Sequence, residues 1–213
     1  MSVQTPIRAI ALSPGSHLLI HDMSWEAYET LLHEFGEDCN VRLAYHSGTL
    51  SLMSPLPKHE RAIVIMSDVV KLILRLQKRP WESLRSSTFK QQGLAGIEPD
   101  DCFYIQNYQR VIGKERIDLT VDPPPDLAIE SDLTSITETS AYAAIQVPEL
   151  WIYRDGSLKI KILQGQCYQD YIESPTFPGL AIAIIIPKVI EQAKIVGTSQ
   201  ALMDLEAELS DRV

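Results

Sequence analysis

A long amphipathic segment, about 59–78, is followed along the chain by three β-rich segments, a shorter helical segment and a fourth β-rich segment. Apolar residues recur through 59–78 at the 3.6-residue period of a helix, with charged residues between them. The β-rich segments are 81–90, 102–105, 126–133 and 150–154, and the second helix is expected over about 135–146. The order helix, strand, strand, strand, helix, strand predicts an α/β protein in which helices flank a mixed sheet.

The flanking segments extend this core, which we place at about 57–173. A helix from Ser24 to Phe35 and a hairpin over 41–53 are predicted before it. Asp155-Gly156 predicts a second hairpin, a strand is expected over 166–172, and two helices are expected around 189–195 and 199–209. Residues 1–20 are expected to be irregular. With 213 residues and no visible linker, we expect a single domain over 1–213.

Composition narrows the class of protein further. The three cysteines, Cys39, Cys102 and Cys167, form no C-x-x-C pair, so we expect free thiols and a reducing cytoplasm. The longest apolar run, 180–186, is too short to cross a membrane, and no membrane role is expected. The net charge of −9 argues against a nucleic-acid partner, although a local basic face, for example Lys71, Arg75 and Lys78, can offset an acidic total.

The segment 125–132 carries most of the chemical information. Alternate residues of a strand share a face, so Asp126, Glu130 and Asp132 are expected to point the same way. Carboxylates this close repel one another, and a divalent cation such as Mg²⁺ removes the conflict. The alternative is a half-exposed strand whose acids face water.

Three other residues are candidates for the same site. Asp100 precedes the neighbouring strand, so its carboxylate can approach that of Glu130, although an Asp-Asp pair is also typical of a turn. Glu60 opens the long helix, where it also complements the helix dipole. Lys90 is the only lysine between Lys78 and Lys114, and an exposed surface position is the alternative for it. No nucleophile elbow, phosphate loop, dinucleotide fingerprint or H-E-x-x-H motif is present.

These elements and acids resemble the core of the restriction-endonuclease-like nucleases, whose signature is P-D…(D/E)-x-K. The chain is most similar to one family within them, the restriction endonucleases long filed as a domain of unknown function. The similarity is carried by EPDDCFYI at 98–105, PPDLAIE at 124–130 and VPELW at 147–151, and it extends over about 24–209.

The resemblance implies a Mg²⁺-dependent endonuclease that hydrolyses DNA phosphodiester bonds and acts as a homodimer, with Mn²⁺ as a possible substitute. Asp100 corresponds to the aspartate of the first signature element and Glu130 to the acid of the second, while Glu60 matches an accessory acid. Asp132 would join Asp100 and Glu130 as a metal ligand.

The chain departs from the signature at one position, because Asp132 stands where lysine is expected. Three alternatives follow: a lysine from elsewhere, for which Lys90 is the candidate, a second metal-binding carboxylate, or loss of activity. A catalytically inactive module that binds nucleic acid or protein is therefore the alternative function. A metal-dependent hydrolase of small phosphate esters is a third.

Overall fold

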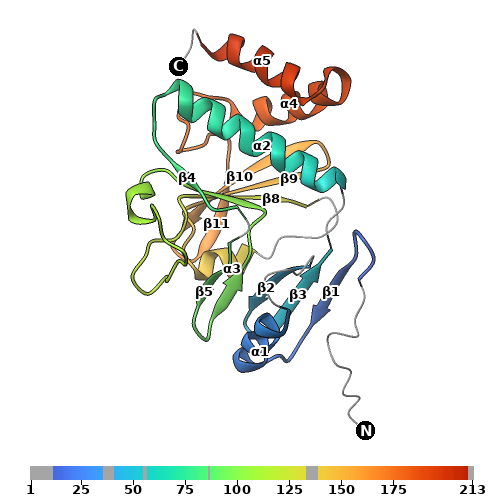
Figure 1. The fold of residues 1–213 in the computed structure, drawn as a ribbon, viewed down its shortest axis with the longest axis vertical. Helices are drawn as coiled ribbons and strands as arrows, with labels where there is room; N and C mark the ends of the chain where they lie inside the picture. The colour runs from blue at the N-terminus through green and yellow to red at the C-terminus, as the bar shows by residue number, and fades with distance from the viewer. Residues whose placement is uncertain (1–11, 36–40, 55–56, 86, 133–138, 211–213) are drawn as a thin grey trace.

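The strands form two sheets in the computed structural model, which describes residues 12–35, 41–54, 57–85, 87–132 and 139–210. The larger sheet has six strands in the order β11-β10-β9-β8-β7-β4, and the smaller has five in the order β1-β3-β2-β6-β5. Figure 1 shows the smaller sheet at the end of the molecule that carries the N-terminus, with the C-terminal helices at the opposite end.

The six-stranded sheet is mixed, as predicted for an α/β protein. β7 (Asp101–Tyr104) pairs antiparallel with β8 (Leu127–Ser131), whereas β8 pairs parallel with β9 (Glu149–Arg154). β4 (Glu82–Ser83) borders β7, and the hairpin of β10 (Ser157–Gln164) and β11 (Cys167–Tyr171) continues from β9. The predicted hairpin at Asp155-Gly156 is therefore confirmed.

Helices cover both faces of this sheet. α2 (Pro57–Leu76), α4 (Ile182–Val196) and α5 (Thr198–Leu209) pack on one face, and the short α3 (Thr139–Ala144) packs on the other (Figure 1). Side chains of β8 alternate between the two cores: Leu127 and Ile129 contact the α2 side, and Ala128 contacts the α3 side. Both faces of β8 are thus buried around the acidic segment.

The helix predicted over 59–78 is confirmed as α2, and the apolar positions of its stripe are buried. It begins at Pro57, because proline is favoured in the first turn of a helix, where its missing N–H is not needed. α4 begins earlier than the predicted 189 because the apolar run 182–186 is its first part and Pro187 lies inside it. None of the helices in the described ranges is long and apolar enough to cross a membrane.

The second sheet was not predicted. β2 (Arg42–His46) and β3 (Thr49–Met53) form the expected hairpin, but β1 (His17–Ile20), β5 (Phe89–Gln91) and β6 (Ala95–Ile97) extend it. α1 (Trp25–Phe35) packs on this sheet through Trp25 and Tyr28. The prediction that 1–20 is irregular is wrong for residues 17–20, which form the edge strand β1. Their side chains are all half-buried or exposed, so they give a weak hydrophobic pattern.

The single strand expected over 81–90 is also wrong, because the segment divides between the two sheets. β4 belongs to the larger sheet and β5 to the smaller, and Arg85, between them, has a φ of 49° that turns the chain. The chain crosses to the smaller sheet here and returns through 98–100 to begin β7. This return brings Glu98 and Asp100 into contact with β2.

Candidate active site

Asp100 and Glu130 lie across from each other on neighbouring strands. The register of β7 and β8 pairs Asp101 with Ile129, and its continuation places Asp100 opposite Glu130 on the same face of the sheet. The Asp100 side chain is fully buried, and its Oδ2 accepts a hydrogen bond from the Ser131 backbone N–H at 2.8 Å. Pairing of the strands therefore brings two carboxylates to one buried location.

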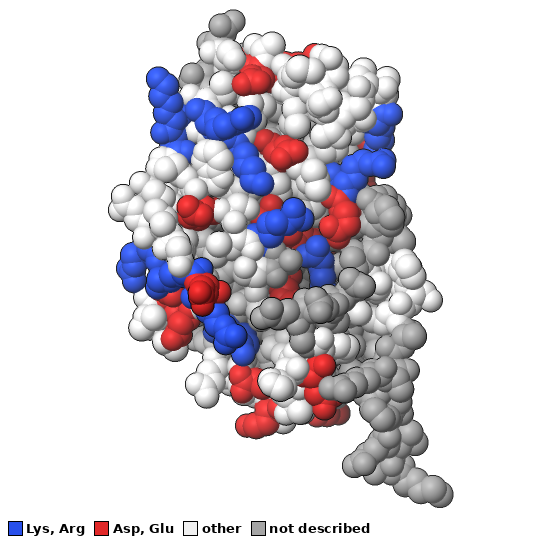
Figure 2. Space-filling view, in the orientation of Figure 1, with Lys and Arg blue, Asp and Glu red and all other residues white. Residues whose placement is uncertain are grey.

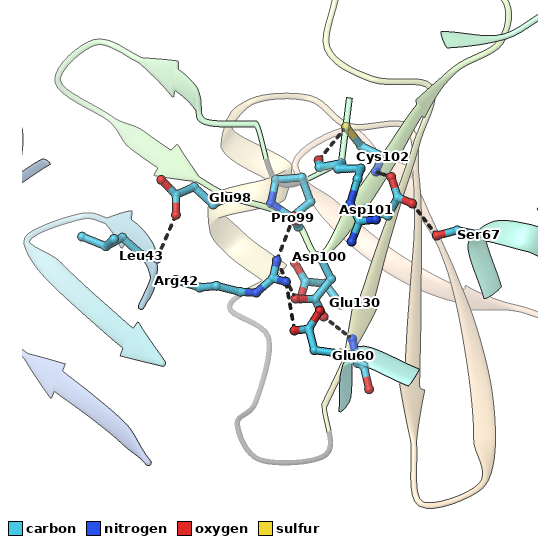
Figure 3. A network of polar contacts seen from close by, with 12 residues as sticks. Arg42, Leu43, Glu60, Ser67, Glu98, Pro99, Asp100, Asp101, Cys102 and Glu130 are labelled. Atoms are coloured by element: carbon cyan, nitrogen blue, oxygen red, sulfur yellow. Dashed lines mark hydrogen bonds and ion pairs between the residues drawn. The ribbon is translucent and has the colours of Figure 1, made fainter. Parts of the chain in front are cut away.

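Arg42 of β2 reaches this location from the other sheet. Its Nη1 lies 3.0 Å from Asp100 Oδ1 and donates to the Pro99 carbonyl at 3.4 Å. Its Nη2 donates to Glu60 Oε1 at 3.2 Å. Figure 3 shows the guanidinium extending from β2 toward Asp100 and Glu60, with Glu130 close by. The guanidinium thus offsets part of the negative charge of the cluster.

Glu130 is held by a tyrosine of α3. The Tyr142 hydroxyl donates a short hydrogen bond to Glu130 Oε1, and the tyrosine side chain is almost entirely buried. Burial and the neighbouring charge of Asp100 raise the pKa of Glu130 well above 4.5, although the Tyr142 bond and Arg42 oppose the increase. Burial and Glu130 likewise raise the pKa of Tyr142 well above 10.0. The site therefore holds more negative charge than its own groups compensate.

This imbalance predicts a pH dependence of stability. Because the pKa of Glu130 is higher in the folded than in the unfolded chain, the unfolded chain releases the proton first as pH rises above 4.5, and stability falls until the folded-state pKa is passed. We expect Glu130→Gln to melt about 2 °C or more above the wild type at pH 7.5 in EDTA. The difference should nearly disappear at pH 5. Thermal unfolding at both pH values measures it, and an equal difference at both would contradict the predicted linkage.

Of the other three predicted site residues, Glu60 and Asp132 lie near this pair, whereas Lys90 does not. Glu60 contacts Arg42, and the charge of Asp132, which is buried, contributes to raising the pKa of Glu130. Lys90 lies on β5, exposed, with its Nζ 3.4 Å from Glu29 Oε1 of α1. The structure brings Glu60 and Asp132 to the Asp100–Glu130 pair and shows no contact between Lys90 and these acids.

Two other acids of the same segments hold the fold together. Asp126 accepts hydrogen bonds from the N–H groups of Ile105 and Asn107, at 2.6 and 3.1 Å, and so holds the loop that follows β7. Glu98 accepts from Leu43 N–H at 3.2 Å and from the Thr88 hydroxyl at 2.9 Å, which joins the return segment to the smaller sheet. Asp126, which was expected to point the same way as Glu130, therefore has a structural partner in the loop after β7.

Sequence reasoning missed Arg42 and the role of Tyr142. Arg42 begins a strand of a sheet that was not predicted, so nothing local indicated its contact with Asp100. Tyr142 lies in the helix expected over about 135–146, and no partner was predicted for it. A signal was present for the tyrosine, because a buried phenol usually requires a hydrogen-bond partner.

The carboxylates fit a cation with few protein ligands. Among the described residues, no group of three His, Cys, Asp or Glu side chains is arranged to hold a metal ion. Mg²⁺, however, commonly takes one or two protein carboxylates and keeps its other positions for water and substrate phosphate. The fully buried Asp100 carboxylate and the raised pKa of Glu130 are the observations that fit such an ion.

The chain is an α/β protein whose mixed sheet is flanked by helices, with Asp100 directly before β7 and Glu130 near the end of β8. The chain belongs to the Uma2 family, described as "Putative restriction endonuclease", whose pattern matches residues 25–189. A search of curated proteins found no match.

The chain is also similar to a solved structure from Anabaena variabilis ATCC 29413, described as "a putative nuclease belonging to DUF820". The two share 18% sequence identity with a TM-score of 0.49, and the match covers 76% of this chain and 91% of that one.

Proposed function

We propose that this protein is a Mg²⁺-dependent endonuclease that hydrolyses phosphodiester bonds of DNA at the Asp100–Glu130 pair. The observation that carries the proposal is that the fully buried Asp100 carboxylate lies opposite the half-buried Glu130, whose pKa is raised by desolvation and by the charge of Asp100. Membership of the Uma2 family supports the reaction class.

Asp100 and Glu130 would hold the ion, and Asp132, whose charge acts on Glu130, and Glu60, which shares Arg42 with Asp100, are the other acids of the site. A bound Mg²⁺, or Mn²⁺ in its place, would supply positive charge to the phosphate and lower the pKa of a bound water. The protein's part is to hold the carboxylates in place. Ser131 N–H fixes Asp100, and the Tyr142 hydroxyl fixes Glu130.

An inactive binding module is the second candidate, favoured by one observation at the signature position. Asp132 stands where the nuclease signature has lysine, and Lys90 pairs with Glu29 instead. Figure 2 shows basic and acidic side chains interspersed on one face of the molecule, with acids gathered at its lower end.

Nicking of supercoiled plasmid in Mg²⁺, Mn²⁺ or EDTA separates the two candidates. We expect nicked circles with either ion and none in EDTA. Linear product would support a homodimer, because one acidic site addresses one strand at a time. Absence of nicking in both ions would contradict the nuclease and leave the binding module.

Calorimetric titration with Mn²⁺ tests the site directly. We expect uptake by the wild-type protein and a loss of affinity of at least about tenfold in Asp100→Asn, because a ligand has lost its charge. Asp170→Asn is the matched control, since Asp170 lies in an exposed pair with Lys161 on the β10–β11 hairpin. Equal affinities in the two variants would remove Asp100 from the metal site.

A further inference from the structure

We propose that Arg42 binds the phosphate of the substrate and supplies the positive charge that the signature lysine would otherwise provide. The inference rests on the proposed nuclease function and assigns to it a residue outside the signature. Asp132 occupies the lysine position, and Lys90 is paired with Glu29 on the smaller sheet. Arg42 is the cation that the described residues place in ion-pair contact with Asp100.

The donors of Arg42 are only partly used. A guanidinium carries five N–H groups. Contacts with Asp100, Pro99 and Glu60 use both Nη atoms, while Nε–H and the second N–H of Nη2 donate to none of the described residues. A planar guanidinium with two donors left over matches the oxygens of a phosphate, which arginine commonly binds through paired hydrogen bonds.

The position of Arg42 is suited to a substrate contact. Its side chain is 17% exposed, whereas that of the Asp100 it contacts is fully buried, so the guanidinium is the more accessible partner of this ion pair. A phosphodiester that approaches the acids would meet a cation on its way. The positive charge of Arg42, which contacts both Asp100 and Glu60, reduces the repulsion that these acids and Glu130 would exert on a phosphate.

The alternative is a purely structural role, in which Arg42 ties the smaller sheet to β7 and α2. The two roles differ in their dependence on salt. Each phosphate contact made by a cationic side chain releases counterions. The plot of log K against log salt concentration has a negative slope, and the loss of one contact makes this slope less steep by about 0.9. A structural tie that makes no phosphate contact leaves this slope unchanged.

The experiment measures binding of a fluorescein-labelled 20-base-pair duplex by anisotropy at several NaCl concentrations, with Ca²⁺ in place of Mg²⁺ and gels to confirm intact DNA. We expect Arg42→Met to weaken DNA binding about tenfold and to make the negative salt slope less steep by about 0.9. Arg42→Lys should keep the slope and lose part of the affinity, because lysine retains the charge without the planar fork. Lys188→Met is the control matched for charge, since Lys188 pairs with Glu208 between α4 and α5.

The possible outcomes separate a failure of this inference from a failure of the proposed function. An unchanged slope in an Arg42→Met protein that melts like the wild type would overturn the phosphate contact. If Arg42→Met does not fold, Arg42→Lys tests the inference instead. A lysine variant that binds DNA with the affinity and the salt slope of the wild type would overturn the need for a guanidinium fork. Wild-type protein that nicks plasmid but shows no effect of Arg42 loses this inference alone, whereas wild-type protein that neither binds nor nicks DNA loses the proposed function with it.

Discussion

Glu130→Gln is expected to lower the rate of plasmid nicking by at least about 100-fold while leaving the protein folded. Glutamine has nearly the same shape and still accepts a hydrogen bond from Tyr142, so the position of the side chain is preserved. The charge that would hold a divalent ion beside Asp100 is lost. The variant therefore separates the chemistry of the site from its packing, and gel quantification of nicked circles over time measures the loss.

Two further measurements make this result decisive. Glu191→Gln is the matched control, because Glu191 is an exposed acid that pairs with Lys194 on α4, away from the site. Thermal unfolding in EDTA should show that Glu130→Gln is at least as stable as the wild type at neutral pH, since a buried repulsion has been removed. Nicking at the wild-type rate by the folded variant would remove Glu130 from the active site.

Asp101→Ala is expected to destabilise the protein by about 3–5 kcal/mol, the cost of breaking a buried and fully bonded charged group. The Asp101 carboxylate is almost entirely buried and accepts hydrogen bonds from the hydroxyls of Ser67 and Ser83, the latter at 3.1 Å, and from the Cys102 N–H at 2.7 Å. These donors lie on α2, β4 and β7, so the residue joins three elements. Denaturant titration followed by circular dichroism measures the free energy of unfolding.

The neighbouring aspartate provides the contrast. Asp100 and Asp101 point to opposite faces of the sheet. Asp100→Asn should therefore cost less stability than Asp101→Ala but show the loss of Mn²⁺ affinity of at least about tenfold described above. Asp101→Ala should retain uptake at temperatures where it remains folded. A loss of stability below about 1 kcal/mol in Asp101→Ala would show that its hydrogen bonds contribute little.

The elements of the larger sheet could be predicted because their signals are local. The apolar period of α2, the Asp155-Gly156 turn and the alternation along β8 each arise within a few residues, and the structure confirms all three. The approach of Asp100 to Glu130 was predicted only on the condition that their strands pair, and the register of β7 and β8 supplies that condition. Alternation gives the face of a side chain but not its partner, so the contact of Asp126 with the loop after β7 could not be predicted.

The sequence by itself determined the helices and strands of the larger sheet around α2, β8 and the β9–β10 hairpin, and it identified Asp100 and Glu130 as candidate acids. Hydrophobic period and strand alternation are properties of consecutive residues, which is why these features could be predicted. Only the tertiary structure decided that the chain builds a second sheet and that β2 of this sheet carries Arg42 to Asp100. The contact of Tyr142 with Glu130 was decided in the same way, by the packing of α3 against β8. These contacts join residues far apart along the chain, and their geometry depends on how sheets and helices fill space around one another, which no local pattern encodes.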